Sequence, residues 1–543
     1  MMSASEPAKS GMSLVKWCII VIGFLLIVRA VTMAIVPLTD PSESRYGNIC
    51  RNMALSDNFV EPMLIHKGEM TTFDGKPPLY FQIGGIACRI FGINEFAVRL
   101  PALLCGILTL LIVFGTVKRL AGSDTAVRTV VLLATAPFFC AFCGICITDM
   151  TLVLCVTGAL CSYMLFTSVG LERPEKRLSG TRSGAVLRLA AAFPEKKFYS
   201  VCFFFFLGLG MLAKGPVALV LSGMPVFFYI LFAKKWKELK DHAWITGFLV
   251  FFAVAAPWYW IMQSRDPEFL KYFFINENFK RFLIKNYGDK FGAGREYFRG
   301  MALIWSALAN ISMIVFLLWP LLKKDLRGKL FSRQDFTGGN ALLAIPVLTV
   351  GSITLFWCLT SRVPVYYILP TVPAAAIATA VLLTRTGFFE SEKRRRIFRV
   401  VSVVLGLSAS IAIAAYYQVQ LHTGIKFPQQ AYAKALQTLK TDPACRGAAV
   451  YIARRTPYSA EFYLGGENLV LHKSEDVWKS LKESENSILI ISDYEIDKLL
   501  EGYLPEKGSR HCKPRRLVGR FHAWRVYAPA GDRSGAEGDG VTP

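Results

Sequence analysis

The chain has 543 residues, of which 53% are apolar and 19% charged, and its mean hydropathy is +0.40. This composition argues against a single soluble globular domain and favours a membrane protein in contact with lipids. Its 62 Lys and Arg against 39 Asp and Glu give a formal net charge of +23. Because no basic and aromatic RNA-binding motif accompanies this charge, nucleic acid is excluded as a partner.

Apolar segments long enough to cross a bilayer recur along most of the chain. The first, about residues 14–36, is too long for a signal peptide and lacks a small-residue cleavage site, so we expect it to be an uncleaved span. Ten further spans are expected at roughly 97–117, 126–142, 150–168, 198–213, 216–233, 243–263, 301–322, 340–360, 365–384 and 397–417. About eleven spans make residues 14–417 a transmembrane domain with the two termini on opposite sides.

The positive charges indicate the orientation, because Lys and Arg are enriched in cytoplasmic connections. Alternate connections carry them, for example Lys118 and Arg119, Lys323 and Lys324, and the run from Lys393 to Arg396. All fall on one side if residues 1–13 are cytoplasmic. The external side then receives a long first loop, residues 37–96, and everything after residue 418.

The composition changes after residue 418 to that of a soluble module. Strand-like and helix-like runs alternate there, which predicts a small external α/β domain over residues 418–530. Strands are expected at 448–453, 468–472, 487–492 and 516–527, and helices at 474–483 and 494–503. Cys445 and Cys512 are its only cysteines, so an oxidising compartment would permit one bridge between them. The tail, residues 531–543, is expected to be disordered.

The first external loop holds two acidic residues just past the end of the first span. Asp40 as N-cap, Pro41 at N1 and Glu43 at N3 resemble the start of a helix that runs to about Leu55. That helix is amphipathic, so it could lie along the membrane interface and hold both carboxylates at the surface. A structural capping role and a catalytic role both remain open for these acids.

Several cations are expected at the same external side. Lys76 precedes two prolines, which aim its ammonium group outward from a helix start where anions are favoured. Lys214, Arg281 and Arg362 stand at the external ends of spans. Ionisable groups near membrane depth are costly, so cations that converge there more often hold an anion than contact lipid headgroups. A lipid phosphate fits such a site, although a lysine that snorkels at the interface would explain Lys76 equally well.

Seven short motifs then occur in a recognisable order: Asp-Pro-Ser-Glu-Ser-Arg-Tyr (40–46), Lys-Pro-Pro-Leu (76–79), Asn-Glu-Phe-Ala-Val-Arg-Leu-Pro (94–101), Ala-Lys-Gly-Pro (213–216), Pro-Trp-Tyr (257–259), Tyr-Phe-Phe (272–274) with Arg281-Phe282, and Pro-Val-Tyr-Tyr-Ile-Leu-Pro (364–370). Over about residues 15–385 the chain resembles the bacterial polyprenyl-phosphate-sugar glycosyltransferases of the GT-C fold, in particular the lipid A aminoarabinose transferases and their family 39 relatives. The resemblance implies a polytopic α-helical protein of the bacterial inner membrane with a periplasmic C-terminal domain.

The resemblance also assigns roles to residues of this chain. It implies that Glu43, with Asp40 nearby, and Asp149 are catalytic acids. Substrate binding is assigned to Arg45, Tyr46, Lys76, Lys214, Arg281, Arg362 and Tyr366. Two departures stand out: Ser42-Glu43 replaces the usual Asp-Glu pair, and the family's proposed metal ligands fall at Gly75 and Asn278. Neither residue type suits zinc, so no such metal site is predicted; no cofactor is assigned, and a divalent metal stays open although the family's ligands are absent.

The implied activity is transfer of a sugar from undecaprenyl phosphate to an envelope acceptor, for which lipid A is the first candidate. Cations would neutralise the charge that develops on the leaving phosphate. Glu43 or Asp40 would act as general base toward a hydroxyl acceptor, whereas a phosphate acceptor needs no base. A single inverting displacement is expected. Protein O-glycosylation is the alternative within enzymes, and a transporter of lipid-linked sugars is the alternative from another class.

Overall fold

The computed structural model describes residues 13–66, 69–169, 194–284, 287, 297–360, 362–423, 429–442, 445, 449–453, 458–464, 469–472, 487–492, 515–521 and 524–529. The chain forms two compact units. The first unit comprises residues 1–34, 74–83 and 99–413, and the second comprises residues 35–73, 84–98 and 414–543. Each unit is described by itself.

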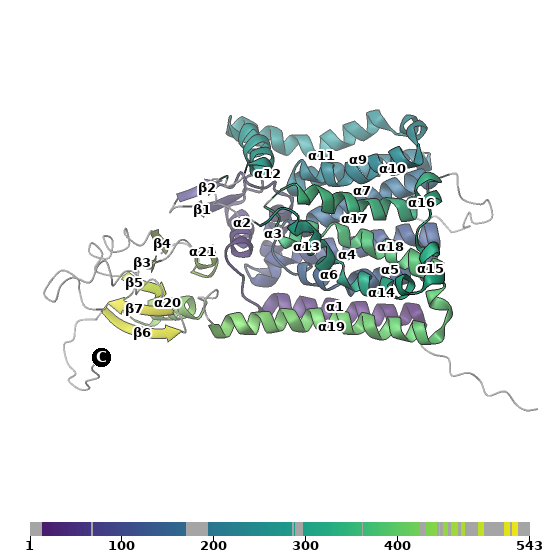
Figure 1. The fold of residues 1–543 in the computed structure, drawn as a ribbon. Helices are drawn as coiled ribbons and strands as arrows, with labels where there is room; N and C mark the ends of the chain where they lie inside the picture. Colours follow the sequence, from purple (N-terminus) through teal and green to yellow (C-terminus); the bar gives the residue numbers. More distant parts are fainter. Residues whose placement is uncertain are drawn as a thin grey trace, which may run out of the picture. The chain divides into compact units, whose positions relative to one another are not determined.

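Apolar helices make up the first unit (Figure 1). Among the described residues, six helices are long and apolar enough to cross a membrane: α1 (Leu14–Ile35), α4 (Glu95–Ala121), α7 (Asp149–Ser168), α9 (Glu195–Lys214), α11 (Trp244–Arg265) and α17 (Ala341–Cys358). A seventh span results if α13 (Met301–Ala309) and α14 (Ile311–Leu322), which meet at 80°, count as one. The protein is therefore a multi-pass membrane protein, as predicted.

Further helices lie at the other predicted spans: α5 (Ser123–Ala134), α6 (Pro137–Phe142), α10 (Val217–Ala233), α18 (Thr371–Arg385) and α19 (Glu392–Thr423). The segment expected as one span at 126–142 is broken into α5 and α6, because Pro137 follows an extended Ala136 and starts a new helix. The total of about eleven spans stays a prediction, since α10 and α18 are shorter than the other spans.

Helix α7 lies at the centre of the first unit. Its most apolar 18-residue window is 89% buried, compared with 22% for α1 and 28% for α11. Helices α9, α10 and α17 pack against it. A helix that is apolar on all sides is stable only when other helices cover it, and this explains why α7 occupies the interior. The position of Asp149, its first residue, is therefore fixed by the core.

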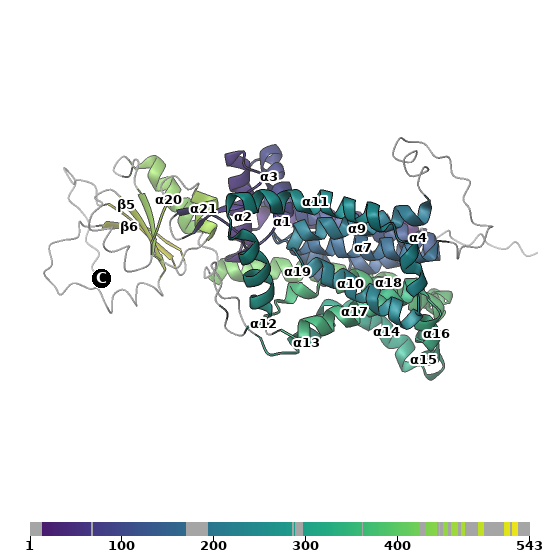
Figure 2. The same ribbon diagram turned by 90° about the horizontal axis from the view of Figure 1, so that it is seen from above.

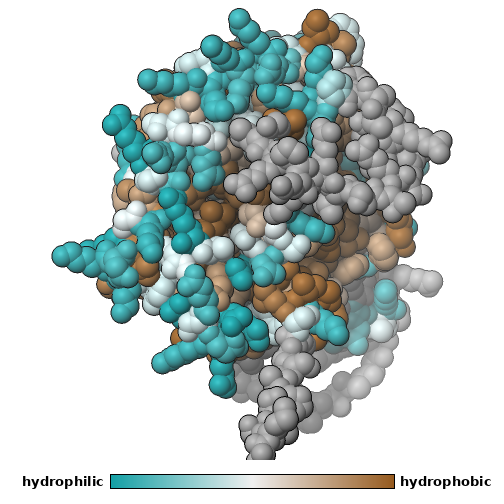
Figure 3. Space-filling view, turned by 90° about the vertical axis from the view of Figure 1, so that its right-hand side faces the viewer, coloured by the Kyte–Doolittle hydropathy of each residue, from teal (hydrophilic) through white to brown (hydrophobic). Residues whose placement is uncertain are grey.

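The two ends of the helix bundle differ in chemistry. Short helices α15 (Lys324–Leu330) and α16 (Arg333–Thr337) lie at one end, and α12 (Arg281–Leu283) lies at the other, as both ribbon views show (Figures 1 and 2). The end with α15 and α16 carries a gathering of hydrophilic side chains (Figure 3). The exposed basic residues there include Lys323, Lys324, Arg327, Lys329 and Arg333. Basic residues therefore gather at one end of the first unit, and the assignment of this end to the cytoplasm stays a prediction.

The second unit joins the first external loop to the C-terminal module. The loop contributes α2 (Ser42–Ser56), the antiparallel strands β1 (Met63–His66) and β2 (Glu69–Thr72), and part of α3 (Leu79–Phe91). The C-terminal module contributes α20 (Gln429–Thr441), α21 (Tyr458–Leu464) and a sheet of order β4-β3-β5-β7-β6. The domain boundaries proposed from the sequence stay predictions.

The sheet contains β3 (Ala449–Ala453), β4 (Leu469–His472), β5 (Ser487–Ser492), β6 (Arg515–Phe521) and β7 (Trp524–Pro529). Strands β3, β4 and β5 pair in parallel, whereas β5–β7 and β6–β7 pair in an antiparallel manner. The single strand expected at 516–527 is wrong, because the run folds into the hairpin β6–β7. The predicted helices at 474–483 and 494–503, the tail at 531–543 and Cys512 lie outside the described residues.

The helix predicted from Asp40 to Leu55 exists as α2, but its start differs from the prediction. Pro41 is the N-cap and no side chain caps the helix. The expected capping role of Asp40 is wrong because its carboxylate bonds to α21 instead. Glu43 does reach back over the helix start, where its Oε2 accepts hydrogen bonds from the N–H and Oγ1 of Thr39, at 2.9 and 3.0 Å.

His242 gives the first unit a pH-dependent stability. It lies between the short 3-10 helix η2 (Trp236–Asp241) and α11, and its side chain is buried, with 8% of the residue exposed. Its ring stacks on Phe166 with the ring centroids 4.0 Å apart, and its Nδ1 lies 2.9 Å from Ser200 Oγ. Burial, with a smaller contribution from Lys196, lowers the pKa of His242 from 6.5 to about 4.

Because the folded state holds this pKa below its unfolded value, the unfolded chain binds the proton first as the pH falls from about 6.5 to about 4. The wild-type protein should therefore lose thermal stability over that interval. His242→Phe keeps the aromatic packing and removes the proton site, so its melting temperature should fall less between pH 7 and pH 5. Melting curves of both proteins in one detergent check this, and parallel pH dependences would contradict it.

Candidate functional site

A buried ion pair joins the first residue of α7 to the last residue of α9. Lys214 Nζ lies 2.5 Å from Asp149 Oδ1, and the two side chains are 6% and 4% exposed. Each charge also suits its helix end, because an acid is stabilised at a helix N-terminus and a cation at a C-terminus. A paired buried charge is tolerated where an isolated one is not, so this pair fixes the two helix ends against each other.

Aromatic rings cover the ammonium group of Lys214. Nζ lies 4.1 Å from the ring centroid of Tyr367 and 5.7 Å from that of Tyr366. Both tyrosines belong to a short 3-10 helix, η4 (Val365–Ile368). Cation–π contacts of this kind are stronger in a desolvated site. Arg362, in the link that leads to η4, is 7% exposed, and its backbone N–H donates to Thr360 Oγ1 at 3.2 Å.

A second group of charges contains a carboxylate that sequence reasoning missed. Glu277 lies in the π-helix η3 (Lys271–Lys280) with its side chain 3% exposed. Arg281 Nη1 donates to both of its oxygens, at 3.0 and 2.6 Å, and Lys76 Nζ lies 3.7 Å from Oε2. π-Helices are rare and often occur at functional sites. The i, i+4 spacing of Glu277 and Arg281 was visible in the sequence, but a surface ion pair explains it equally well.

The two groups belong to one site. The carboxylate of Asp149 is close enough to Lys76 as well as to Lys214 for an attractive Coulomb interaction with each. The π-helix also packs directly on the residue after Lys214, since a Cβ placed on Gly215 would lie 2.7 Å from the Phe273 ring and 3.8 Å from Asn278 Nδ2. The structure therefore brings together five of the predicted residues, namely Lys76, Asp149, Lys214, Arg281 and Tyr366, and adds Glu277 and Tyr367.

A cavity of about 220 Å³ includes Phe282, the residue after Arg281, in its lining. The lining also includes Tyr297, Arg299 and Thr360. Aromatic side chains together with the guanidinium of Arg299 suit a molecule that has both an apolar and an anionic part.

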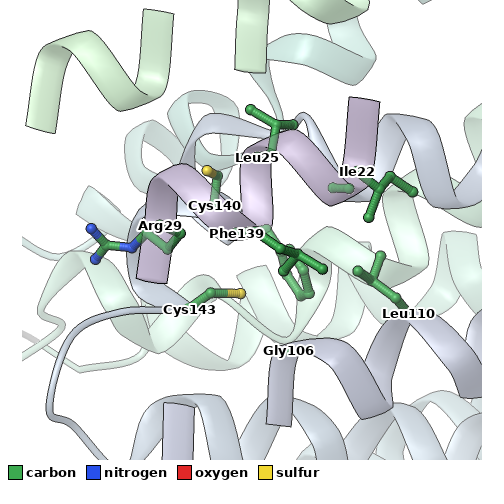
Figure 4. Close-up of a pocket in the computed structure, with 10 residues that line it drawn as sticks. Ile22, Leu25, Arg29, Gly106, Leu110, Phe139, Cys140 and Cys143 are labelled. Atoms are coloured by element: carbon green, nitrogen blue, oxygen red, sulfur yellow. The ribbon is translucent and has the colours of Figure 1, made fainter. Parts of the chain in front are cut away.

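A second cavity, of about 20 Å³, lies between α1, α4 and α6 and has room for no more than one water molecule (Figure 4). The guanidinium of Arg29 points away from Phe139 and Leu110 in this view. Its Nη2 donates to the carbonyl of Ala141 at 2.6 Å. This bond holds the end of α6, from which the chain leads to Asp149.

Arg362 lies in the first unit, and the other four predicted residues, Asp40, Glu43, Arg45 and Tyr46, belong to the second unit. Glu43 is 2% exposed, and both Oδ atoms of Asp40 accept hydrogen bonds from Ser459, one from its N–H at 3.0 Å and one from its hydroxyl. The guanidinium of Arg45 lies over the rings of Tyr46, Phe73 and Tyr458, at 5.4, 5.3 and 5.7 Å.

The polar face of α2 is covered by α21 rather than exposed at an interface. Asn48 Nδ2 donates to the carbonyl of Tyr458 at 2.6 Å, and Asn52 Nδ2 donates to Glu461 Oε1 at 2.9 Å. Glu461 is 1% exposed, and burial raises its pKa even though the Asn52 bond lowers it. No sequence pattern indicates these contacts, because the residues lie about 410 positions apart.

Known proteins share this architecture. The crystal structure of ArnT from Cupriavidus metallidurans bound to undecaprenyl phosphate matches 97% of this chain and 100% of its own, with a TM-score of 0.71 at 17% identity. The apo oligosaccharyltransferase of Archaeoglobus fulgidus matches 89% of this chain and 70% of its own, with a TM-score of 0.53 at 13% identity. The chain has the GT-C fold. The predicted fold class is thereby confirmed.

Sequence comparison gives relatives of higher sequence identity over part of the chain. A family model described as dolichyl-phosphate-mannose-protein mannosyltransferase matches residues 75–179. An undecaprenyl phosphate-alpha-4-amino-4-deoxy-L-arabinose arabinosyl transferase of Edwardsiella ictaluri is 26% identical over 401 residues, or 72% of this chain and 64% of the relative. An uncharacterized protein of Aquifex aeolicus is 27% identical over 382 residues, or 70% of this chain and 65% of the relative. The chain thus spans just under two thirds of the length of these relatives.

This GT-C chain offers poor metal ligands at the positions where the resemblance places them. Gly75 has no side chain, and the amide of Asn278 is engaged with the carbonyl of Phe273 at 2.8 Å. Within the described ranges, no three His, Cys, Asp or Glu side chains gather as a metal site. The residues do not fit zinc, and the chemistry proposed below uses none.

Gly215 makes the close packing of the site possible. Its φ of +80° is a conformation that only glycine adopts without strain, and a Cβ there would meet Phe273 at 2.7 Å.

Gly215→Ala should destabilise the folded protein by about 1–2 kcal/mol from the backbone alone, with a further loss from displacement of Phe273. Thermal unfolding in detergent measures the effect. Gly223→Ala in α10 is the matched control, because its Cβ would meet nothing within 4 Å; equal melting temperatures for the two variants would contradict the assignment.

Proposed function

We propose that this chain is a membrane glycosyltransferase that moves a sugar from an undecaprenyl-phosphate carrier to lipid A or another envelope glycolipid. The observation that carries the proposal is the cluster of Lys76, Lys214 and Arg281 at the end of the bundle opposite the basic helices α15 and α16. The similarity of the fold to an ArnT structure bound to undecaprenyl phosphate supports it, as does the sequence similarity to aminoarabinose transferases.

The orientation follows from the distribution of charge. We place the basic end of the first unit in the cytoplasm, because Lys and Arg are retained on that side of the bacterial inner membrane. The N-terminus is then cytoplasmic, and the cation cluster, the first loop and the C-terminal module face the periplasm.

The chemistry requires stabilisation of one leaving group. The acceptor oxygen attacks the anomeric carbon of the donor sugar, the bond from that carbon to the phosphate oxygen breaks, and the electron pair leaves with the polyprenyl phosphate. Lys76, Lys214 and Arg281 would bind this phosphate and neutralise the charge that develops on it. The cavity lined by Phe282 and Arg299 offers room for another part of the substrate.

The acceptor proton needs a base when the acceptor is a hydroxyl group. We propose Glu43 for this role, in keeping with the first-loop acid that the resemblance assigns; its buried carboxylate accepts bonds from Thr39 at the start of α2. Both carboxylate oxygens of Asp40 accept bonds from Ser459. Asp40 is then a positioning residue that holds the start of α2. A phosphate acceptor is nucleophilic without a base near neutral pH, and Glu43 would then orient the substrate. Asp149 positions Lys214, and the displacement inverts the anomeric centre.

Protein O-glycosylation is the second candidate function. The match of residues 75–179 to the mannosyltransferase family model favours it, because this segment contains Lys76 and Asp149. The two functions share the donor phosphate site and differ only in the acceptor.

Three substitutions test the proposal in membranes supplied with a polyprenyl-phosphate sugar. Lys214→Ala leaves Asp149 buried without its partner and removes a phosphate ligand, so transfer should fall at least 100-fold. Glu43→Gln keeps the shape of the side chain and should reduce transfer to a hydroxyl acceptor 10²–10⁴-fold, the usual contribution of a general base. Asp40→Asn should retain more activity than Glu43→Gln, since an amide oxygen still accepts one bond from Ser459.

Lys271→Ala, which removes an exposed cation of a surface pair, is the control and should transfer at the wild-type rate. Wild-type rates in Lys214→Ala and Glu43→Gln would contradict the proposed site.

Extraction of the labelled product into lipid or its retention on polypeptide distinguishes the two acceptors. Movement of the intact donor across vesicles without cleavage would indicate a transporter instead.

A further inference from the structure

The charges of the site alternate in sign. Arg281 contacts Glu277, Glu277 contacts Lys76, Lys76 interacts with Asp149, and Asp149 contacts Lys214. Three cations therefore share two carboxylates. Asp149 pairs with Lys214 and joins the start of α7 to the end of α9, so a structural role explains its position. Glu277 has a different position, since it is the carboxylate that contacts both Lys76 and Arg281.

The substrate and product of the proposed reaction differ in charge. A sugar bonded to polyprenyl phosphate is a phosphodiester with one negative charge. The released polyprenyl phosphate is a monoester whose second ionisation has a pKa near 6, so it carries between about −1.5 and −2 at neutral pH. Cations hold a dianion more tightly than a monoanion. A site made of cations alone would thus bind the product more tightly than the substrate and would release it slowly.

We propose that Glu277 is a charge-balancing residue that weakens the binding of the polyprenyl monophosphate product and so promotes its release. Its repulsion acts on a phosphate held by Lys76 and Arg281, and a dianion experiences about twice the repulsion of a monoanion at the same place. The side chain is 3% exposed, so water screens this repulsion little. The inference rests on the proposed function, because it requires a phosphate at this cluster.

Direct binding of two probes tests this role without any knowledge of the sugar. The probes are undecaprenyl phosphate, which becomes a dianion as the pH rises, and its methyl ester, which stays a monoanion. At pH 8, Glu277→Gln should bind undecaprenyl phosphate about tenfold more tightly than wild type and the methyl ester about threefold more tightly, because the effect on the free energy doubles with the charge. At pH 5.5 the gain for undecaprenyl phosphate should fall to about threefold.

A structural role of Glu277 predicts another result. If the carboxylate only orders Lys76 and Arg281, Glu277→Gln weakens both probes by the same factor at both pH values, and this outcome would overturn the inference, as would unchanged affinities. Glu277→Asp, which keeps the charge, should retain the wild-type ratio of the two affinities. Glu268→Gln is the matched control, because Glu268 forms an exposed pair with Lys271 near the start of η3 and should change neither affinity.

Melting curves establish that each variant is folded. If Glu277→Gln is not folded, Glu277→Leu removes the charge with a similar volume and must shift the two affinities in the same direction. Failure of the proposed function has a separate signature: the wild-type protein then binds neither probe. Failure of the inference alone leaves wild-type binding and sugar transfer intact.

Discussion

The buried pair of Lys214 and Asp149 is the interaction on which the site depends. It joins the end of α9 to the start of α7, the most buried of the candidate spans. An unpaired charge buried here would destabilise the folded protein, and removal of either partner leaves the other charge buried and unpaired. The pair therefore ties the position of the ammonium group to the packing of the whole bundle. The tyrosines of η4 and the π-helix η3 then assemble around it.

The cation cluster holds carboxylates as well as cations, and this decides what it can do. Three cations with two carboxylates keep a net positive charge, which would suit the phosphodiester of the proposed donor. Each cation is also paired and ordered, so a phosphate that leaves in the proposed reaction would require little rearrangement. The arrangement is preorganised because each charged residue begins or ends a helix, precedes one, or lies in the π-helix.

In the second unit, a distant part of the chain supports the first loop. Helix α21 covers the polar face of α2 through the hydrogen bonds of Asp40, Asn48 and Asn52. Buried polar groups of this kind are costly when unpaired and rigid when satisfied. The C-terminal module is thus part of the structure that holds Glu43, whatever else it binds.

The sequence by itself determined the membrane class, the places of most apolar helices, the gathering of basic residues in alternate connections and most residues of the cation cluster. These depend on local properties: apolar length, positive charge in short connections and short motifs. The tertiary structure alone decided that Glu277 belongs to the cluster, that Asp40 bonds to Ser459 rather than capping its own helix, and that α21 covers α2. The contacts of Asp40 and of α21 join polar groups that lie far apart in the sequence. The spacing of Glu277 and Arg281 is explained equally well by a surface ion pair. No pattern of spacing or hydropathy could therefore reveal these contacts.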